Sequence, residues 1–160
     1  MTKKIPLTQG KFALVDDEDF ECLSSFKWHY HSGYAKRGKF ISRIDGKQKI
    51  KIFYMHREII KTPDDMITDH IDGDGLNNQR HNLRIASRAQ NAMNSKTIKK
   101  SFSNVKGVSW HKGAGKWQSK IVVNGQTKYL GHFADIDSAT QAYNAAAIEH
   151  FGEFARLNKI

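Results

Sequence analysis

A short polar segment near the middle of the chain constrains the fold more than any other feature, because it offers almost nothing to a hydrophobic core. Residues 95–104 read SKTIKKSFSN, in which only Ile98 and Phe102 are large and apolar. We interpret this segment as a basic linker. The chain of 160 residues is therefore predicted to form two small folded parts, one on each side of it.

The single cysteine limits how those parts can be held together. Cys22 has no partner for an internal disulfide, and it cannot build a structural zinc site of four cysteines. With 39% hydrophobic residues, the chain has enough apolar side chains for packed cores without resembling a membrane protein. We therefore expect no structural zinc, and cores that are stable through packing alone.

Positive charge is concentrated in one stretch of the chain. The formal net charge is +10, yet residues 75–134 contain no Asp or Glu and eleven Lys or Arg, which leaves the remainder nearly neutral. Nucleic acid fits such a stretch better than a membrane surface, since no basic amphipathic helix with a broad apolar face accompanies the charge. No apolar run is long enough to span a membrane, and the first ten residues lack the apolar core of a signal peptide, so we expect a cytoplasmic protein.

Residues 1–65 are predicted to form a β-rich N-terminal segment. KFALVDDEDF is typical of a strand that leads into a turn, FKWHYHSGYAKRGKF alternates aromatic and polar residues, and KQKIKIFY has the period of two that marks a half-buried strand. A short helical turn, HREII, ends before Pro63. Trp28, Tyr30 and Tyr34 are predicted to form a small core, the alternative being a platform for stacking bases.

Residues 66–94 combine side chains that can hold a metal ion and activate water against a phosphodiester. MITDHID is typical of a strand that ends in a loop, LRIAS of a returning strand, and SRAQNAMN of a short helix. Asp69 and His70 place a carboxylate beside an imidazole, and Asn82 and Asn91 add two spaced amides. Neighbours in a strand point to opposite faces, so Asp69 and His70 can share a site only where the strand ends or bulges. The turn dipeptides DG and GDG also leave open a plain polar hairpin.

The spacing of this segment follows one pattern, which consists of Asp69-His70, Gly73, Asn77-Asn78, Asn82-Leu83-Arg84 and Asn91. The pattern resembles the HNH endonucleases, in particular the zinc-free group found among phage and intron homing endonucleases. This resemblance implies a ββα-metal nuclease unit over the two strands and the helix.

The same resemblance implies a role for each matched side chain. His70 would be the general base and Asn82 would orient it, while Asp69 and Asn91 would bind one Mg²⁺ or Mn²⁺ ion through oxygen atoms. Two neighbouring amides in the loop, Asn77 and Asn78, are expected to stabilise the loop rather than to take part in catalysis. A phosphate contact by His56 or Arg57 stays open.

Residues 105–160 are predicted to form a second small domain. In KWQSKIVVNGQTKYLGHF the pair Asn124-Gly125 separates two alternating runs, which is the strongest short-range signal for a hairpin. A helix is expected from about Ile136 to Phe151, ended by Gly152. Alternation in the first run puts Trp117, Ser119, Ile121 and Val123 on the face towards this helix, and Lys116, Gln118 and Lys120 on the other face.

Several stretches of this part, KGVSWHKGAGKWQSKI, YLGHF, ATQAYNAAA and ARLN, resemble the AP2 domain. The resemblance implies a three-stranded sheet packed on one helix, with the sheet in the major groove of DNA. The expected DNA-binding residues are Lys106, His111, Lys116, Gln118, Lys120, Lys128, Tyr129 and His132. Plant AP2 domains are Arg-rich at these places, whereas no Arg lies between Arg88 and Arg156, so we expect phosphate anchoring by Lys and loose base specificity.

Together the two resemblances predict an α+β chain with a β-rich segment over 1–65, an HNH motif over 66–94, a linker over 95–104 and an AP2-like domain over 105–160. The expected function is that of a metal-dependent homing-type endonuclease that cuts double-stranded DNA, with no membrane partner and no small-molecule cofactor. One alternative is a non-catalytic AP2-type DNA-binding regulator with a relic HNH unit. Another is an RNA-binding protein that uses exposed aromatic side chains.

Overall fold

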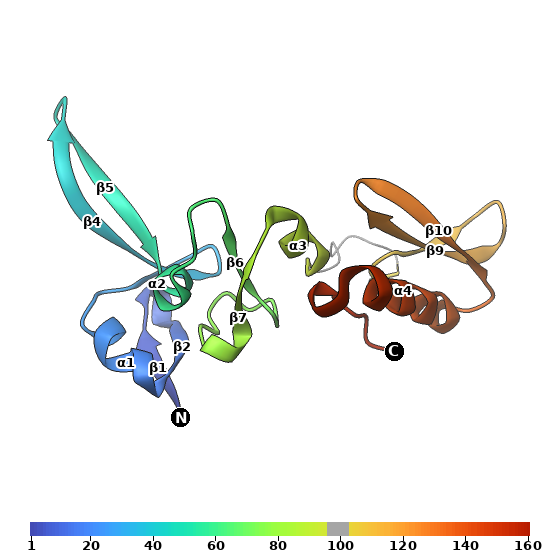
Figure 1. Ribbon diagram of the computed structural model, residues 1–160, viewed down its shortest axis with the longest axis horizontal. Helices are drawn as coiled ribbons and strands as arrows, with labels where there is room; N and C mark the ends of the chain where they lie inside the picture. Colours follow the sequence, from blue (N-terminus) through green and yellow to red (C-terminus); the bar gives the residue numbers. More distant parts are fainter. Residues whose placement is uncertain (96–102) are drawn as a thin grey trace. The chain divides into compact units, whose positions relative to one another are not determined.

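The computed structural model describes residues 1–95 and 103–160, and it has a mixed α+β fold with small sheets (Figure 1). The predicted linker lies mostly outside the described residues. The chain separates into two compact units, Met1–Arg88 and Ala89–Ile160. This division falls inside the predicted motif, so its two strands belong to the first unit and its helix to the second.

The first unit combines short strands, short helices and 3-10 turns. Its strands are β1 (Thr2–Pro6), β2 (Phe12–Asp16), β3 (His29–His31), β4 (Tyr34–Ile44), β5 (Lys47–Tyr54), β6 (Ile67–His70) and β7 (Leu83–Ala86). Its helical elements are η1 (Thr8–Gly10), α1 (Asp17–Ser24), α2 (Met55–Ile60) and η2 (Arg80–Asn82). All strand pairings among them are antiparallel: β1 with β2, β3 with β4, β4 with β5, and β6 with β7.

One core joins the N-terminal strands to the motif strands. Trp28 is 2% exposed, and its indole N–H donates to the carbonyl of Leu23 at 2.8 Å, so its one polar atom is satisfied. Val15 from β2, Met55 from α2 and Leu83 from β7 pack in the same cluster. The prediction that Trp28 belongs to a small core is confirmed, and this core fixes the place of the strand that follows the motif loop.

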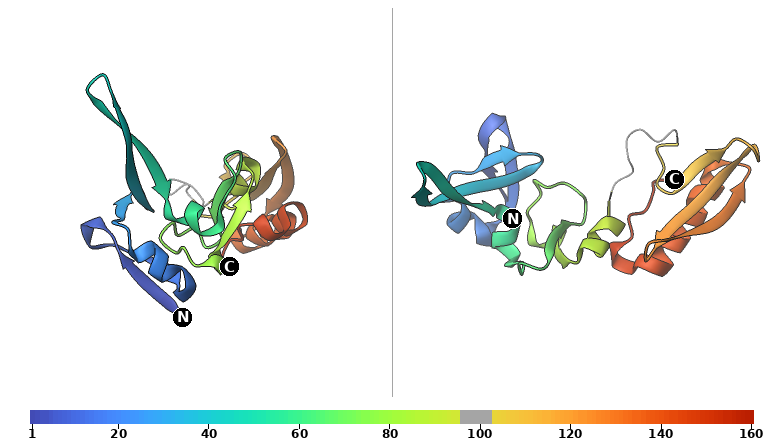
Figure 2. Two further views of the ribbon diagram at one scale, coloured as in Figure 1. Left: turned by 60° about the vertical axis from the view of Figure 1, so that its left-hand side comes forward. Right: turned by 90° about the horizontal axis from the view of Figure 1, so that it is seen from above.

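Two predictions for the N-terminal segment are wrong. The residues after β2 do not form a turn but begin α1 at Asp17, and its first turn carries three acidic side chains, an arrangement that the positive end of a helix favours. The strand KQKIKIFY, now β5, is not half buried, because only Phe53 and Tyr54 lose much of their exposure. It pairs with β4 in a long ribbon that extends from the rest of the unit (Figure 2).

The second unit contains helix α3 (Arg88–Met93) and a three-stranded antiparallel sheet beside one long helix. The sheet has the order β10-β9-β8, formed by β8 (Val108–His111), β9 (Lys116–Val123) and β10 (Gln126–Phe133). Helix α4 (Ile136–Phe151) covers one face of it, and the short turn η3 (Gly152–Phe154) follows (Figure 1). Among the described residues, no helix is long and apolar enough to cross a membrane.

The sequence signals for the hairpin and the helix of the second unit are confirmed. Asn124 and Gly125 form the two-residue turn between β9 and β10, both with positive φ, as a tight hairpin requires. Asp135 caps α4, because its side chain accepts a hydrogen bond from the backbone N–H of Ser138 at 2.7 Å. At Gly107 any side chain would collide with the ring of Tyr143, so the chain before β8 can lie directly on α4.

Candidate active site

Strand β6 ends at His70, and this end allows neighbouring residues to serve one site. In the antiparallel pair of β6 and β7, Asp69 lies opposite Arg84 and His70 opposite Leu83. Directly after His70 the chain turns, since the N–H of Gly73 donates to the carbonyl of His70 at 2.8 Å. Both Asp69 and His70 are buried, at 4% and 6% exposure. That Asp69 and His70 share one site stays a prediction, because both residues still pair with β7.

The carboxylate of Asp69 is paired with the guanidinium across the strand. Arg84 Nη2 and Nε lie 2.7 and 2.8 Å from the same oxygen, Asp69 Oδ2, and both side chains are largely buried. A buried carboxylate is costly unless it is paired, so Arg84 makes the burial of Asp69 possible. The sequence motif contained Arg84, but its contact with Asp69 becomes visible only once the register of the two strands is known.

The imidazole of His70 is oriented by Asn78. His70 Nε2 lies 3.1 Å from Asn78 Oδ1, and Asn78 is fully buried. The amide nitrogen of Asn78 donates to the carbonyl of Leu76 and to the sulfur of Met55, so its oxygen is the atom that faces the imidazole. His70 Nε2 then carries the proton, and in the neutral ring the lone pair lies on Nδ1.

The electrostatic environment favours the neutral form of His70. Burial lowers the pKa of His70 below its ordinary value, although the hydrogen bond to Asn78 acts in the opposite direction. A neutral imidazole at neutral pH can accept a proton from water, which is what a general base must do.

The side chain of Asn82 forms hydrogen bonds within the loop after β6 rather than with His70, so the orienting role that the resemblance implies for it stays a prediction. Its amide nitrogen donates to Asp72 Oδ1 at 3.0 Å and to the carbonyl of Asn77 at 2.8 Å, and its oxygen accepts from the N–H of Asp72. Its own carbonyl accepts from the N–H of Ile71. Asn82 therefore braces the loop after β6, while the orienting contact comes from Asn78, which we had expected only to stabilise the loop.

The carboxylate of Asp72 accepts several of the hydrogen bonds that stabilise this loop. One carboxylate oxygen accepts from the N–H of Asp74, and the other accepts from the amide of Asn77 at 2.8 Å. Burial alone would raise the pKa of Asp72, but these hydrogen bonds and the one from Asn82 outweigh it and lower the pKa. At Gly75 a side chain would collide with the carbonyl of Gly33 and the ring of Tyr34, so the loop packs closely against the start of β4.

Aromatic rings from the base of the ribbon surround His70. The ring of His56 meets that of His70 edge to face at 5.1 Å and stacks on Tyr54 at 5.5 Å, and Tyr34 lies 5.9 Å from His70. His56 is 8% exposed, and burial lowers its pKa to about 3, with His70 and Arg57 adding to the effect. Tyr34, predicted for the core, is instead 41% exposed and forms part of this wall.

Two charged groups outside the wall have structural contacts. Arg57, a candidate for a phosphate contact, donates to the carbonyls of Thr62, Pro63 and Met66 and thus holds the turn before β6. The carboxylates of Asp16, Glu18 and Asp19 lie close enough together to hold a metal ion. Their observed partner, however, is Arg80, which pairs with Glu18 and Asp19 and donates its backbone N–H to Asp16. This cluster therefore anchors η2.

Asn91, the second predicted metal ligand, lies on α3 in the second unit, and its side chain is half buried. That Asn91 completes a metal site with Asp69 stays a prediction. In the first unit, Asp69 directly precedes His70 in β6, and its carboxylate pairs with Arg84. A carboxylate and an amide oxygen form a donor set that suits Mg²⁺ or Mn²⁺ rather than a soft metal.

The face of the sheet that points away from α4 gathers most of the predicted DNA-binding residues. The register places Tyr129 opposite Lys120, His132 opposite Gln118, and His111 opposite Lys116. The rings of His111 and His132 lie 4.9 Å apart, and Tyr129 is 70% exposed. On the other face Ser119 and Ile121 are buried, as alternation predicted.

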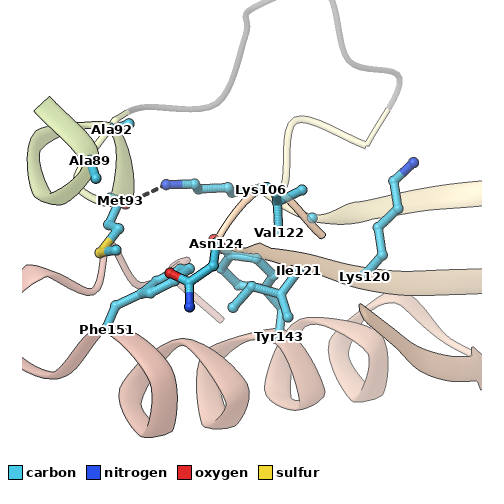
Figure 3. Close-up of a pocket in the computed structure, with 12 residues that line it drawn as sticks. Ala89, Ala92, Met93, Lys106, Lys120, Ile121, Val122, Asn124, Tyr143 and Phe151 are labelled. Atoms are coloured by element: carbon cyan, nitrogen blue, oxygen red, sulfur yellow. Dashed lines mark hydrogen bonds between the residues drawn. The ribbon is translucent and has the colours of Figure 1, made fainter. Parts of the chain in front are cut away.

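Lys106 and Lys128 do not belong to this face of the sheet, and DNA contacts by these two lysines stay predictions. Lys106 is half buried, and its Nζ donates to the carbonyls of Met93 and Ser95 at 2.5 and 2.9 Å, beside a largely apolar cavity of about 420 Å³ (Figure 3). Its burial also lowers its pKa. Lys128 lies opposite Ile121 on the helix side, with its Nζ 3.4 Å from His150 Nε2 on α4.

Comparisons with known proteins agree with the position of this site. Residues 61–93 match the sequence model of a family described as HNH endonuclease. An uncharacterized HNH endonuclease of Acanthamoeba polyphaga mimivirus is 36% identical over 154 residues, which cover 95% of this chain and 77% of that protein. Protein 3.8 of Escherichia phage T7 is 34% identical over 89 residues, 56% of this chain and 73% of that protein.

Proposed function

The chain belongs to the HNH endonuclease family and is a nuclease, and we propose that it is a metal-dependent DNA endonuclease of the homing type with His70 as its general base. The observation that carries this proposal is the hydrogen bond between His70 Nε2 and the buried amide oxygen of Asn78. This bond selects the tautomer whose Nδ1 can accept a proton.

In the proposed reaction, a water molecule gives a proton to Nδ1 of His70 as its oxygen attacks the phosphorus. The bond from phosphorus to the 3′ oxygen breaks, and the 3′ oxygen leaves. Burial supports this role, because it lowers the pKa of His70 and keeps the ring neutral at neutral pH. Asn78 acts as a positioning residue, and Asn82 holds the loop that carries Asp72 and Asn77.

We assign the divalent ion, Mg²⁺ or Mn²⁺, to Asp69 and Asn91. When bound, such an ion supplies positive charge that stabilises the phosphoryl oxygens and the leaving 3′ oxygen. The burial of Asp69 beside Arg84 supports a fixed orientation of the carboxylate. No cysteine other than Cys22 is present in the sequence, which is in keeping with a nuclease unit that needs no structural zinc.

We further assign targeting to the second unit, as an AP2-like DNA-binding domain. The exposed face with His111, Lys116, Gln118, Tyr129 and His132 supports this role, because it offers cationic and hydrogen-bonding groups to a duplex. The competing function is a DNA-binding regulator with a relic nuclease unit. The buried and oriented imidazole of His70 favours catalysis, since a relic site would have no need of it.

Cleavage of supercoiled plasmid DNA tests the metal requirement of this function. We expect nicked or linear product in Mg²⁺ or Mn²⁺, complete loss of product after exhaustive chelation, and recovery when Mg²⁺ is added back. Product that persists after chelation would contradict the one-metal mechanism. Duplex binding without cleavage in either ion would favour the regulator, and preferential binding of single-stranded RNA in competition would favour an RNA-binding protein.

A further inference from the structure

Among the described residues, no further strand pairs with the ribbon formed by β4 and β5 over most of its length. Strand β3 pairs only with the beginning of β4, from Tyr34 to Lys36. Beyond that point, from Gly38 to Ile52, every residue is exposed except Ser42, which is half buried. The ribbon extends away from the rest of the first unit (Figures 1 and 2). Two strands alone are marginally stable in water, so an exposed ribbon of this length needs a reason.

Charge is the first indication of what the ribbon binds. Residues 34–54 contain seven Lys or Arg and one acidic residue, Asp45, which lies in the turn. Lys39 lies directly opposite Lys51, and Lys49 follows on the same face. In the part of the chain that the structure describes, none of these three lysines pairs with a carboxylate. Like charges directly opposite each other destabilise a strand pair, and a polyanion would offset that cost.

The opposite face of the ribbon is apolar. Phe40 lies opposite Ile50, and Ile50 folds over Gly38, where an added Cβ would come within 2.8 Å of its methyl group. Phe40, Ile50 and Ile52 are 58%, 49% and 45% exposed. The ribbon therefore has one basic face and one apolar face. A two-stranded ribbon is narrow enough to enter the major groove of B-form DNA.

The base of the ribbon adjoins the candidate active site. Tyr54, the last residue of β5, stacks on His56, and the ring of His56 meets that of His70. Tyr34, the first residue of β4, lies against His70 as well. A duplex with its phosphodiester at His70 would therefore lie beside the ribbon. A second copy of this chain fits less well, because a partner on the apolar face would leave the opposed side chains of Lys39 and Lys51 without a counter-charge.

We propose that the β4–β5 ribbon is a second DNA-binding arm, which contacts the phosphate backbone through Lys39, Lys49 and Lys51. This inference rests on the proposed function, because it takes duplex DNA as the substrate. The ribbon adds a DNA contact in the first unit to the DNA contacts assigned to the second unit. The first unit would then bind the duplex on one side of His70.

The arm is tested by replacing its three lysines together, as Lys39→Gln, Lys49→Gln and Lys51→Gln, in the full chain. Affinity for a duplex oligonucleotide is measured from 50 to 200 mM salt. We expect the affinity to fall about tenfold or more, and the slope of log affinity against log salt to decrease by roughly 2 to 3, since each phosphate contact contributes about 0.9. Thermal unfolding should be unchanged or shifted upward, because repulsion between the lysines is removed.

A matched control carries the same change of charge elsewhere in the first unit, at the exposed residues Lys4, Lys11 and Lys27. This control should bind DNA almost as the unaltered protein does. Equal losses in both triple variants would overturn the inference and leave only a general charge effect. Unchanged binding by the arm variant, together with a change of oligomeric state when Phe40 and Ile50 become Ser, would make the ribbon an interface between copies and also overturn it.

The outcome for the arm can be separated from the outcome for the proposed function. Metal-dependent plasmid cleavage with no effect of the arm variant on binding would retain the nuclease assignment and remove the arm. Specific loss of binding in the arm variant, without cleavage by the unaltered protein, would retain the arm and remove the assignment. A protein that binds no duplex DNA at all would overturn both.

Discussion

At the scale of single residues, the tautomer of His70 decides whether the site can work. An imidazole needs its lone pair on the side of the water, and the amide oxygen of Asn78 fixes the proton on Nε2. The amide of Asn78 is held in turn by Leu76 and Met55, so it cannot rotate without losing these contacts. The orientation of this imidazole, the proposed base, is therefore determined by the packing of the first unit's core.

Substitutions can distinguish the roles of Asn78 and Asn82. We expect Asn78→Ala to reduce the cleavage rate by roughly 10- to 100-fold while the Mg²⁺ concentration for half-maximal activity changes little, because the base loses its orientation. Nitrogen NMR shifts of the His70 ring should report a mixture of tautomers. Asn82→Ala should mainly lower the melting temperature, because three hydrogen bonds of the loop are lost. The opposite pattern, with Asn82 controlling the tautomer, would restore the orienting role predicted from sequence.

The sequence motif contains Asp69, His70, Asn78 and Asn82, but residue spacing alone does not tell which of them contact one another. Asp69 and His70 follow from the motif, whereas the choice between Asn78 and Asn82 depends on how the loop folds back. The sequence also could not place the side chain of Lys106. A lysine near a predicted DNA-binding surface can equally donate to carbonyls at the end of α3, as Lys106 does. Such contacts depend on distances in the folded structure, which cannot be read from the spacing of residues in the sequence.

At the scale of elements, alternation works where another element covers one face. It predicted the buried face of β9 correctly, because α4 packs on Ser119 and Ile121. The same alternation in β5 predicted a half-buried strand, yet the outer part of the ribbon is exposed in the part of the chain that the structure describes. A period of two shows that two faces differ, but not that either face is buried.

Strand β9 contains a buried hydroxyl group whose effect on stability can be tested. The hydroxyl of Ser119 is buried and has no hydrogen-bond partner among the described residues. An unsatisfied buried hydroxyl costs about 1–3 kcal/mol, so we expect Ser119→Ala to raise the free energy of unfolding by roughly 1 kcal/mol in thermal or denaturant unfolding. Ser109→Ala, on the opposite face of the sheet, should change it by less than about 0.5 kcal/mol. A loss of stability in Ser119→Ala would show that the hydroxyl has a partner.

At the scale of the whole molecule, DNA cleavage and DNA binding are proposed to depend on different residues. His70 and its wall lie in the first unit, and the exposed sheet face lies in the second. Removal of the proposed catalytic imidazole of His70 should therefore stop cleavage without lowering the affinity for DNA. The charge distribution supports this division, because the lysines of the β4–β5 ribbon and the cationic residues of the second unit are separate from His70, while Arg80 and Arg84 pair with carboxylates.

The most direct test of this account compares His70→Ala with His81→Ala, a change at an exposed histidine of the same motif. Single-turnover cleavage of a duplex in Mg²⁺ and affinity for the same duplex are measured for both. We predict that His70→Ala loses roughly 10²- to 10⁴-fold in cleavage rate with nearly unchanged affinity, while His81→Ala matches the unaltered protein. Cleavage by His70→Ala at the unaltered rate would contradict the assignment of His70 as the general base.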